Sequence, residues 1–553
     1  MINFKIVGFL GVMYTLTSCG QGQSNKITDI TKSDGIISPL HEVNIGKIVF
    51  IPNMEYQESD FLETFELSPS NDLNISAFLN NSLTNYLHQL APDLTIEELH
   101  KKGNYQFSFL IDGELIYKEN LNFGAGLPEQ KNKQTILTIP LQNEHLGYKL
   151  WSSYMWDRFF YRNGGEAALK TGNHILKIEI RPYLESKEII IGDLIAEGEL
   201  KLKLGEPEKA TEEQVAIQPI KPYKGWEISK EDYDRERIRA LNRDIAEYKF
   251  KKITSIVVVK NGKLIVEEYF NGANRSTQHN TRSVGKSFAS TVTGIAIGDG
   301  YLKSENQSLA EFYDLTQYKN YSAKKDSVTL KSLLTMSSGF DANDFTMDSP
   351  GNEEYMYPTD NWVKFALDLP MDKTKIIGKN WDYFTAGVVV LGDILDKSVP
   401  GGLEKYTHEK LFKPLGITNY TWQYTPQKVA NTAGGLQMNS LDYAKYGQLY
   451  RNGGKWEGNQ ILPESWVKAS MTKHFMEKDD KPSYGYLFWN QSFKVNNKTY
   501  ETFFSSGNGG NKIFFFTDQP LVVVITATAY GEAYAHPQAN QIMQDYILPA
   551  MLE

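Results

Sequence analysis

A serine and a lysine three positions apart, Ser283 and Lys286, are the residues of this sequence best placed to form a catalytic pair. A serine hydroxyl is a weak nucleophile until a base removes its proton, and a lysine can be that base where burial or nearby cations lower its pKa. On a helix this spacing puts both side chains on one face. Because residues 287–297 are apolar and small, we expect Ser283 at the N-terminus of a buried helix, where free N–H groups favour a developing oxyanion.

The Ser-x-x-Lys spacing also occurs at Ser322, Ser465 and Ser470, so chance readily produces it. Taken alone, Ser283 could equally be a helix-capping serine with a surface lysine nearby. Its surroundings favour the catalytic interpretation, because it follows a predicted strand hairpin and opens an apolar helix of small residues.

Four further phrases follow Ser283 in order: LLTMSSG at 333–339, YFTAG at 383–387, GGLQM at 434–438 and SSGNGG at 505–510. With the stretch 435–466, they resemble the β-lactamase-like serine hydrolases: class C β-lactamases, related esterases and D-aminopeptidases, and 6-aminohexanoate-dimer hydrolases. The resemblance covers residues 226–553. It implies a serine β-lactamase-like α+β fold, in which an antiparallel sheet lies between helices in a three-layer α/β/α arrangement.

The resemblance also implies roles for individual residues. Ser283 would attack an acyl carbonyl, and Lys286 would support its deprotonation. Tyr383 would relay the proton to the leaving group, and without the resemblance it would be one tyrosine among 32. The backbone N–H groups of Ser283 and Asn508 would form the oxyanion hole, and water would hydrolyse the acyl-enzyme.

Two positions depart from the family pattern. Thr385 stands where relatives have the Asn of a Tyr-x-Asn motif, so its hydrogen bonding to substrate or to Lys286 is in doubt. The third motif, Lys-Thr-Gly or His-x-Gly in relatives, reads Ser505-Ser506-Gly507. A cation there would pair with a substrate carboxylate, as in β-lactams or D-Ala-D-Ala peptides. Because this cation is missing, we expect ester or amide hydrolysis rather than β-lactamase or DD-peptidase activity.

Three hypotheses stay open. The first is a hydrolase of small esters, amides or peptides that acts through Ser283. The second is a β-lactamase or cell-wall DD-peptidase, which acylation by penicillin would reveal. The third is a catalytically silent binding lipoprotein that keeps the fold, although the presence of Ser283, Lys286 and Tyr383 together argues against it.

Composition excludes several other classes. The formal charge is −9 over 553 residues, which argues against a nucleic-acid surface with clustered Lys and Arg. The nine histidines include no His-Glu-x-x-His, and no Gly-x-Ser-x-Gly elbow is present. We therefore expect no metal and no cofactor, and a small-molecule or peptide as the partner; the oligomeric state is left open.

The single cysteine, Cys19, ends a segment typical of an exported protein. Lys5 is followed by an apolar run, residues 6–16, that is too short to cross a bilayer as a permanent helix. Residues 16–19, Leu-Thr-Ser-Cys, resemble a bacterial lipobox, in which the cysteine becomes the acylated N-terminus. We expect a lipoprotein held by Cys19 on the periplasmic side of a membrane, and Gly20 favours the outer membrane.

The rest of the chain divides by composition. Residues 1–19 are the expected signal peptide, 20–40 a flexible tether, 41–204 an all-β sandwich of possibly immunoglobulin-like type, and 205–225 a linker rich in Pro, Glu and Lys. Period-two alternation at 174–180 and 199–204 predicts half-buried strands, and Asp112-Gly113 predicts a tight turn, whereas residues 76–90 could be partly helical.

The hydrolase domain at 226–553 should begin and end with hairpins. Residues 254–260 and 263–269 flank an Asn-Gly turn at 261–262. Residues 513–516 and 521–527 flank a second turn at 518–520. Mostly helical segments lie between these hairpins, which is the pattern of one sheet flanked by helices.

Overall fold

The computed structural model describes residues 28–68, 71–142, 151–205, 209–346, 348–475 and 483–552. Its backbone contacts divide the chain into two compact units, Met1–Gly205 and Glu206–Glu553. The predicted signal peptide, with Cys19, and the first part of the predicted tether lie outside the described residues. Within the described ranges, every helix is too short or too polar to cross a membrane.

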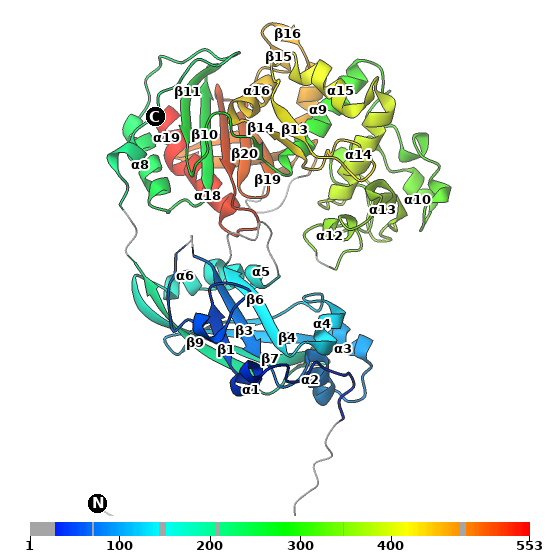
Figure 1. Cartoon of the computed structure of the whole chain (residues 1–553). Helices are drawn as coiled ribbons and strands as arrows, with labels where there is room; N and C mark the ends of the chain where they lie inside the picture. Colours follow the sequence, from blue (N-terminus) through cyan, green and yellow to red (C-terminus); the bar gives the residue numbers. More distant parts are fainter. Residues whose placement is uncertain are drawn as a thin grey trace, which may run out of the picture. The chain divides into compact units, whose positions relative to one another are not determined.

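Two sheets form the first unit (Figure 1). The larger has the strand order β2-β9-β7-β4-β5, with β8 paired to β7, and the smaller has the order β1-β3-β6. Their bounds are β1 Ile48–Ile51, β2 Thr64–Glu66, β3 Leu73–Phe78, β4 Gly103–Ile111, β5 Glu114–Asn120, β6 Ile136–Gln142, β7 Gly172–Glu185, β8 Ile189–Ile191 and β9 Ala196–Leu204. The residues predicted as strands at 174–180 and 199–204 lie in β7 and β9, which pair antiparallel.

One apolar core is shared by both sheets of this unit. Phe50 and Ile75 of the smaller sheet pack in the same cluster as Phe107 and Ile178 of the larger sheet. The sheets come so close that a Cβ atom on Gly198 would lie 2.0 Å from the carbonyl oxygen of Ile48. Short helices occupy the connections: α1 Pro39–Asn44, α2 Leu83–Leu90, α3 Ile96–Lys102, α4 Pro128–Lys133, α5 Trp151–Asp157 and α6 Gly165–Ala168.

A seven-stranded antiparallel sheet forms the centre of the second unit, with the order β11-β10-β21-β20-β19-β18-β17. The strands are β10 Ile253–Lys260, β11 Lys263–Tyr269, β17 Ser483–Tyr484, β18 Trp489–Val495, β19 Lys498–Gly507, β20 Asn511–Phe516 and β21 Leu521–Ala527. Both predicted hairpins are present. The turn of the first hairpin consists of Asn261 and Gly262, whose φ angles are 52° and 75°.

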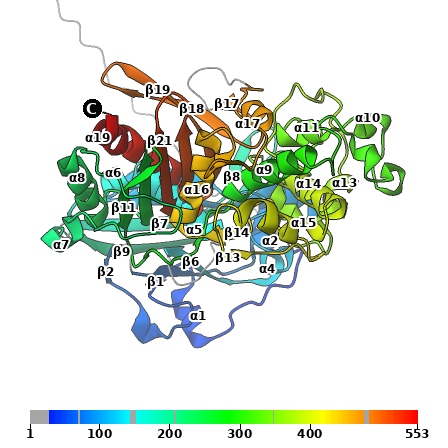
Figure 2. The ribbon, with the colours of Figure 1, turned by 90° about the horizontal axis from the view of Figure 1, so that it is seen from above.

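Helices cover both faces of this sheet, which gives the three-layer α/β/α fold (Figure 1, Figure 2). On one face α8 Arg235–Ala246, α18 Ala535–Gln541 and α19 Leu548–Leu552 pack on Ile256 and Val258 of β10. On the other face α9 Val284–Gly298 and α16 Ser440–Arg451 lie in one apolar cluster with Val257 and Val259, and α14 Thr385–Ser398 packs against α9. Successive strand residues thus enter opposite cores, as the pleat of a strand requires.

Further helices surround α9 and α14 in this unit. They are α10 Ala323–Asp326, α11 Leu330–Leu334, α12 Glu353–Met356, α13 Trp362–Asp368, α15 Gly402–Thr407 and α17 Glu464–Ser470. Two small sheets complete it, one of β12 His279–Asn280, β14 Leu436–Met438 and β13 Tyr420–Trp422, the other of β15 Lys455–Trp456 and β16 Asn459–Gln460.

Part of the predicted linker is packed against the second unit. The short helix α7, Glu212–Val215, is capped by Thr211, and its Val215 is 1% exposed. Arg239 of α8 pairs with Glu212 at 2.9 Å. The proline and charged residues of this stretch predict no regular structure, but the capping box forms a helical turn there, and that turn packs against α8.

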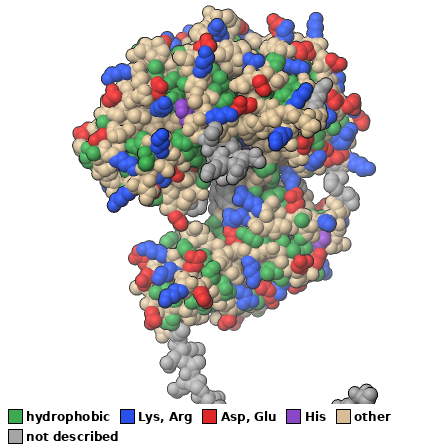
Figure 3. All heavy atoms as spheres, turned by 180° about the vertical axis from the view of Figure 1, so that it is seen from behind, with side chains coloured by type: hydrophobic (Ala, Val, Ile, Leu, Met, Phe, Trp, Pro, Cys, Tyr) green, Lys and Arg blue, Asp and Glu red, His purple; other side chains and the backbone are tan. Residues whose placement is uncertain are grey.

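Charged side chains are mixed in sign on the surface. In the space-filling view, Lys and Arg side chains lie among Asp and Glu side chains over the visible face of each unit (Figure 3). Such mixing is ordinary for a solvated surface.

Candidate active site

Ser283 immediately precedes α9, whose residues from Val284 to Ala296 are all buried. The preceding residue, Arg282, has a φ angle of 53°, in the left-handed region that residues other than glycine seldom adopt. Its guanidinium carbon lies 4.6 Å from the centre of the Tyr530 ring, and the Tyr530 hydroxyl donates to the carbonyl of Asn280 at 2.8 Å. These contacts hold a sharp turn that leaves the Ser283 side chain half-buried at the end of the helix.

Two glycines let other segments approach the backbone of Ser283. A Cβ atom on Gly507, the last residue of β19, would lie 1.8 Å from the carbonyl oxygen of Thr281 and 3.2 Å from the Ser283 nitrogen. A Cβ atom on Gly434 would lie 3.0 Å from the carbonyl carbon of Arg282. The end of β19 can therefore lie beside the Ser283 N–H group only because position 507 has no side chain.

Lys286 reaches the hydroxyl of Ser283 from inside the protein. Its Nζ atom lies 2.8 Å from Ser283 Oγ and 2.7 Å from the carbonyl oxygen of Ala433, and the residue is 2% exposed. Among the described residues, no carboxylate lies within ion-pair distance of this lysine. The pair thus joins a surface hydroxyl to a buried amine, which is the arrangement required to activate a serine.

The three other Ser-x-x-Lys matches, all within the described ranges, are built differently. Lys325 donates to two backbone carbonyl groups, those of Lys319 and Leu367. Lys468 pairs with Glu464, and Lys473 pairs with Glu501. Of the four lysines, Lys286 alone donates to the serine of its own motif, so the structure separates the candidate from the chance matches.

Tyr383 lies just before α14, and its ring faces Lys286. The Lys286 Nζ atom is 5.2 Å from the centre of the Tyr383 ring. The tyrosine is 9% exposed, and its hydroxyl makes no hydrogen bond within the described parts of the chain. That hydroxyl is therefore available to a bound molecule, as a proton donor must be.

Thr385, the first residue of α14, does not complete the Tyr-x-Asn pattern. Its hydroxyl is buried and has no hydrogen-bond partner, although its backbone N–H donates to Asp344 Oδ2 at 2.7 Å. The N–H of Asp344 in turn donates to the carbonyl of Tyr383 at 2.8 Å. Burial, and after it the nearby Glu353 carboxylate, raise the pKa of Asp344 to about 6. Asp344, which no sequence motif singled out, thus holds the Tyr383 segment from both sides.

The third motif presents no cation on the α9 side of the sheet. Ser505 is fully buried, and its hydroxyl has no hydrogen-bond partner. Ser506 points to the other face, where Lys512 of β20 lies directly opposite and donates to its hydroxyl at 2.8 Å. Lys512 is 5% exposed, and burial lowers its pKa to about 7. The sequence analysis did not single out this lysine.

Asn508 uses its side chain to shape the turn after β19. Its Oδ1 atom accepts from the N–H of Gly531, and its carbonyl oxygen accepts from the side chain of Asn511, both at 2.8 Å. Pairing of β18 with β19 stops at Phe504, so residues 505–507 have no partner strand on that side within residues 483–552. This strand end lies next to Ser283.

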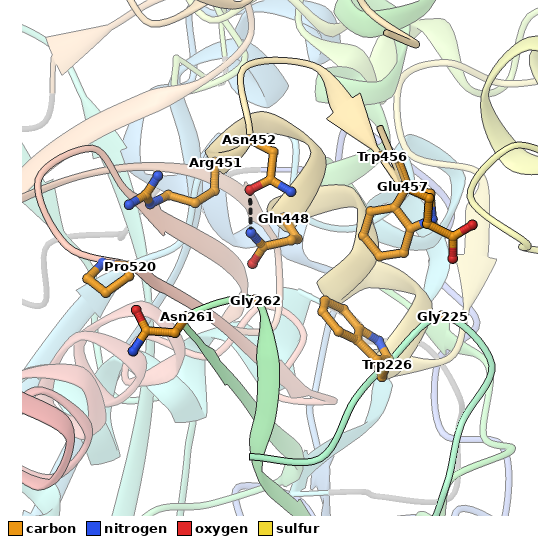
Figure 4. Close-up of a pocket in the computed structure, with 10 residues that line it drawn as sticks. All are labelled: Gly225, Trp226, Asn261, Gly262, Gln448, Arg451, Asn452, Trp456, Glu457 and Pro520. Carbon is orange, nitrogen blue, oxygen red and sulfur yellow. Dashed lines mark hydrogen bonds between the residues drawn. The ribbon is translucent and has the colours of Figure 1, made fainter. Parts of the chain in front are cut away.

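A separate pocket of about 420 Å³ lies elsewhere in this unit (Figure 4). Trp226 and Trp456 pack edge to face on one side of it, and the Gln448 side chain donates to Asn452 on the other. None of the candidate catalytic residues lines this pocket. The residues that line it include no serine, lysine or histidine.

Comparison with known proteins gives a family match for the second unit. The family model described as Beta-lactamase matches residues 245–546, more than half of the chain. No curated protein matches the chain. Among solved structures, a protein assigned as a 6-aminohexanoate-dimer hydrolase from Bacillus anthracis is 19% identical, over 55% of this chain and 81% of that one, with a TM-score of 0.45.

Two other solved structures are similar over a comparable share of the chain. A protein assigned as a beta-lactamase from Bacteroides dorei is 17% identical, over 57% of this chain and 99% of that one, with a TM-score of 0.46. The octameric penicillin-binding protein homologue from Pyrococcus abyssi is 19% identical, over 56% of this chain and 77% of that one, with a TM-score of 0.42.

Proposed function

The chain belongs to the beta-lactamase family, whose members are typically serine hydrolases, and we propose that it cleaves small ester, amide or peptide bonds through an acyl-enzyme on Ser283. The observation that carries the proposal is the 2.8 Å contact between Ser283 Oγ and the buried Nζ atom of Lys286. The same contact is missing from the other three Ser-x-x-Lys motifs in the described residues.

In the proposed reaction, the neutral amine of Lys286 accepts the hydroxyl proton while Ser283 Oγ bonds to the carbonyl carbon of the substrate. The carbonyl oxygen becomes an oxyanion, which the N–H groups of Ser283 and Asn508 stabilise. The intermediate then breaks its bond to the leaving group, Tyr383 delivers a proton to the departing oxygen or nitrogen, and the protonated Lys286 returns a proton to Tyr383. In the second half, water attacks the acyl-enzyme and gives a proton to Lys286. The bond between the acyl carbon and Ser283 Oγ then breaks, Lys286 returns that proton to Oγ, and the acid leaves.

The third motif favours esters and amides over penicillins and D-Ala-D-Ala peptides as substrates. A substrate carboxylate would need a cation near the open end of β19, and position 505 holds a buried serine instead. Lys512 does not replace that cation, because it lies on the other face of the sheet with Phe504 and Phe514. The carboxylate of a substrate bound at Ser283 would thus lack a cationic partner, and nothing would offset the free-energy cost of removing it from water.

A substrate panel tests this proposal. The full chain, the Ser283→Ala variant and the matched control Ser465→Ala are each assayed with small esters, anilides and a chromogenic cephalosporin. We expect ester and anilide hydrolysis in the full chain and in Ser465→Ala, and none in Ser283→Ala. Turnover of the cephalosporin above that of the esters would instead support the β-lactamase candidate. Equal activity in all three chains would contradict any role of Ser283.

We further propose that the chain works at a membrane through a lipid on Cys19. The support is the sequence of residues 1–19, in which the single cysteine follows an apolar segment and small residues. Expression in a bacterium fed a radiolabelled fatty acid should label the full chain and should not label Cys19→Ser. Labelling of both chains, or of neither, would contradict the anchor.

A further inference from the structure

Tyr383 is the middle ring of a stack of three aromatic side chains. The ring of Phe345 lies 5.2 Å from that of Tyr383 with an interplanar angle of 16°, and the ring of Trp489 lies 6.0 Å away on an angle of 23°. We call Phe345, Tyr383 and Trp489 the aromatic stack. Phe345 is 68% exposed, so the stack has one open end.

Two further rings hold the aromatic stack in place. The ring of Trp381 lies within 6.2 Å of all three of its members. Tyr484 packs edge to face on Trp489, with ring centres 4.8 Å apart. Aromatic contacts of this kind stabilise beyond the area they bury, so the stack is a fixed surface rather than a set of independent side chains.

Hydrogen bonds of residues 343–345 hold the loop that carries Phe345. The N–H of Phe345 donates to Asn343 Oδ1 at 2.9 Å, and the Asn343 amide donates to Asp382 Oδ1 at 3.0 Å. Asp344 bonds to the backbone of Tyr383 and of Thr385. The loop thus fixes an exposed aromatic ring against Tyr383, and a planar group of a ligand could pack on that ring.

The aromatic stack lies beside the reacting hydroxyl. The Tyr383 ring centre is 5.2 Å from Lys286 Nζ, which is 2.8 Å from Ser283 Oγ. Phe345 stacks directly on the Tyr383 ring, so its exposed side chain adjoins the residue that faces the Ser283–Lys286 pair.

We propose that Phe345 binds an aromatic ring carried by the leaving alcohol or amine of the substrate, which rests on the proposed function of Ser283. Tyr383 is the residue assigned to protonate the leaving group, so the group that departs lies on the Tyr383 side of the serine. The ring of that group packs against the exposed side chain of Phe345. The substrate class is thus esters of arylmethyl alcohols and amides of arylmethylamines.

Two isomeric esters distinguish the leaving-group side from the acyl side. Benzyl acetate carries its ring on the alcohol, methyl phenylacetate carries it on the acid, and methyl acetate has none. The full chain should prefer benzyl acetate to its isomer in kcat/KM. Phe345→Ala should lower kcat/KM about three- to tenfold more for benzyl acetate than for methyl acetate, whereas Phe345→Tyr should keep the preference.

The outcomes separate this inference from the proposed function. A loss in Phe345→Ala that is equal for all three esters, or that falls on methyl phenylacetate, would overturn the assignment of Phe345. A binding assay needs no turnover: saturation-transfer NMR should show benzyl alcohol bound to the Ser283→Ala chain, and adding Phe345→Ala should weaken the signal at least threefold. An unchanged signal would also overturn it. Absence of all ester hydrolysis, with that signal present, would count against the role of Ser283 alone.

Discussion

The Nζ atom of Lys286 lies 2.8 Å from Oγ of Ser283, although the lysine is 2% exposed and the serine reaches the surface. The second hydrogen bond of this amine goes to the neutral carbonyl of Ala433, and no carboxylate among the described residues pairs with it. Lys468, by contrast, forms an ion pair with Glu464. The hydrogen bond to Oγ puts the Lys286 amine within proton-transfer distance of Ser283.

Replacing Lys286 by methionine should lower kcat for ester hydrolysis about 100-fold or more, because a general base contributes rate enhancements of that order. Methionine fills the same buried space, so the thermal unfolding temperature should change little. Lys468→Met, in the exposed motif of α17, is the matched control and should keep full activity. Activity of Lys286→Met within threefold of the parent would rule out a proton-transfer role.

Gly507→Ala should abolish most of the activity. Its Cβ atom would lie 1.8 Å from the carbonyl oxygen of Thr281, so β19 would have to move away from the Ser283 N–H group. Such a backbone shift costs about 1–3 kcal/mol of unfolding free energy and displaces the oxyanion hole. Gly205→Ala, where no atom lies within 4 Å, is the control. Urea unfolding and ester kinetics on both variants check this, and unchanged kinetics in Gly507→Ala would contradict the placement of the oxyanion hole.

Asp344→Asn should lower kcat about tenfold while Ser283 still reacts with an active-site probe. The two carboxylate oxygens of Asp344 accept hydrogen bonds from the backbone N–H groups of Thr385 and Glu353. Asparagine has one oxygen, so it can accept only one of these bonds, and its NH2 group would face the other N–H. The Tyr383 segment would shift, whereas the Ser283–Lys286 contact would not. If Asp344→Asn lost both its labelling by the probe and its kcat, Asp344 would support the whole site rather than the Tyr383 segment alone.

Lys512 should make stability depend on pH. Burial lowers its pKa from 10.5 to about 7, so between these values the unfolded chain binds a proton that the folded chain does not. The unfolding free energy should therefore rise with pH from 7 to about 10, by up to about 1.4 kcal/mol per pH unit relative to Lys512→Met, which has no proton to bind. Urea unfolding at pH 7, 8 and 9 measures the difference. The same pH dependence in the two chains would contradict a buried, uncharged Lys512.

Local patterns predicted the hairpins and the place of Ser283, because alternation, Asn-Gly turns and a small-residue helix act through neighbouring residues. Both hairpins at the ends of the second unit are present, and Ser283 precedes the buried helix α9. The aromatic stack could not be predicted, since Phe345, Tyr383 and Trp489 come from segments far apart in the sequence.

Buried ionisable side chains were the least predictable feature. A lysine in a sequence usually means a solvated surface, yet Lys512 lies in β20, whose residues are all buried. The signal was present, because the strand reads Asn-Lys-Ile-Phe-Phe-Phe and an apolar run of this kind belongs to a core. For Asp344, by contrast, no local pattern exists: its partners Glu353 and Thr385 are brought to it only by the folded loop.

The most direct test of the account is covalent labelling of the full chain with a fluorophosphonate, followed by intact mass measurement and peptide mapping. We expect one adduct, located on Ser283, in the parent chain and in Ser465→Ala, and none in Ser283→Ala. An adduct on another serine, or no adduct in folded chain that retains its native unfolding transition, would contradict the claim that Ser283 is an activated nucleophile.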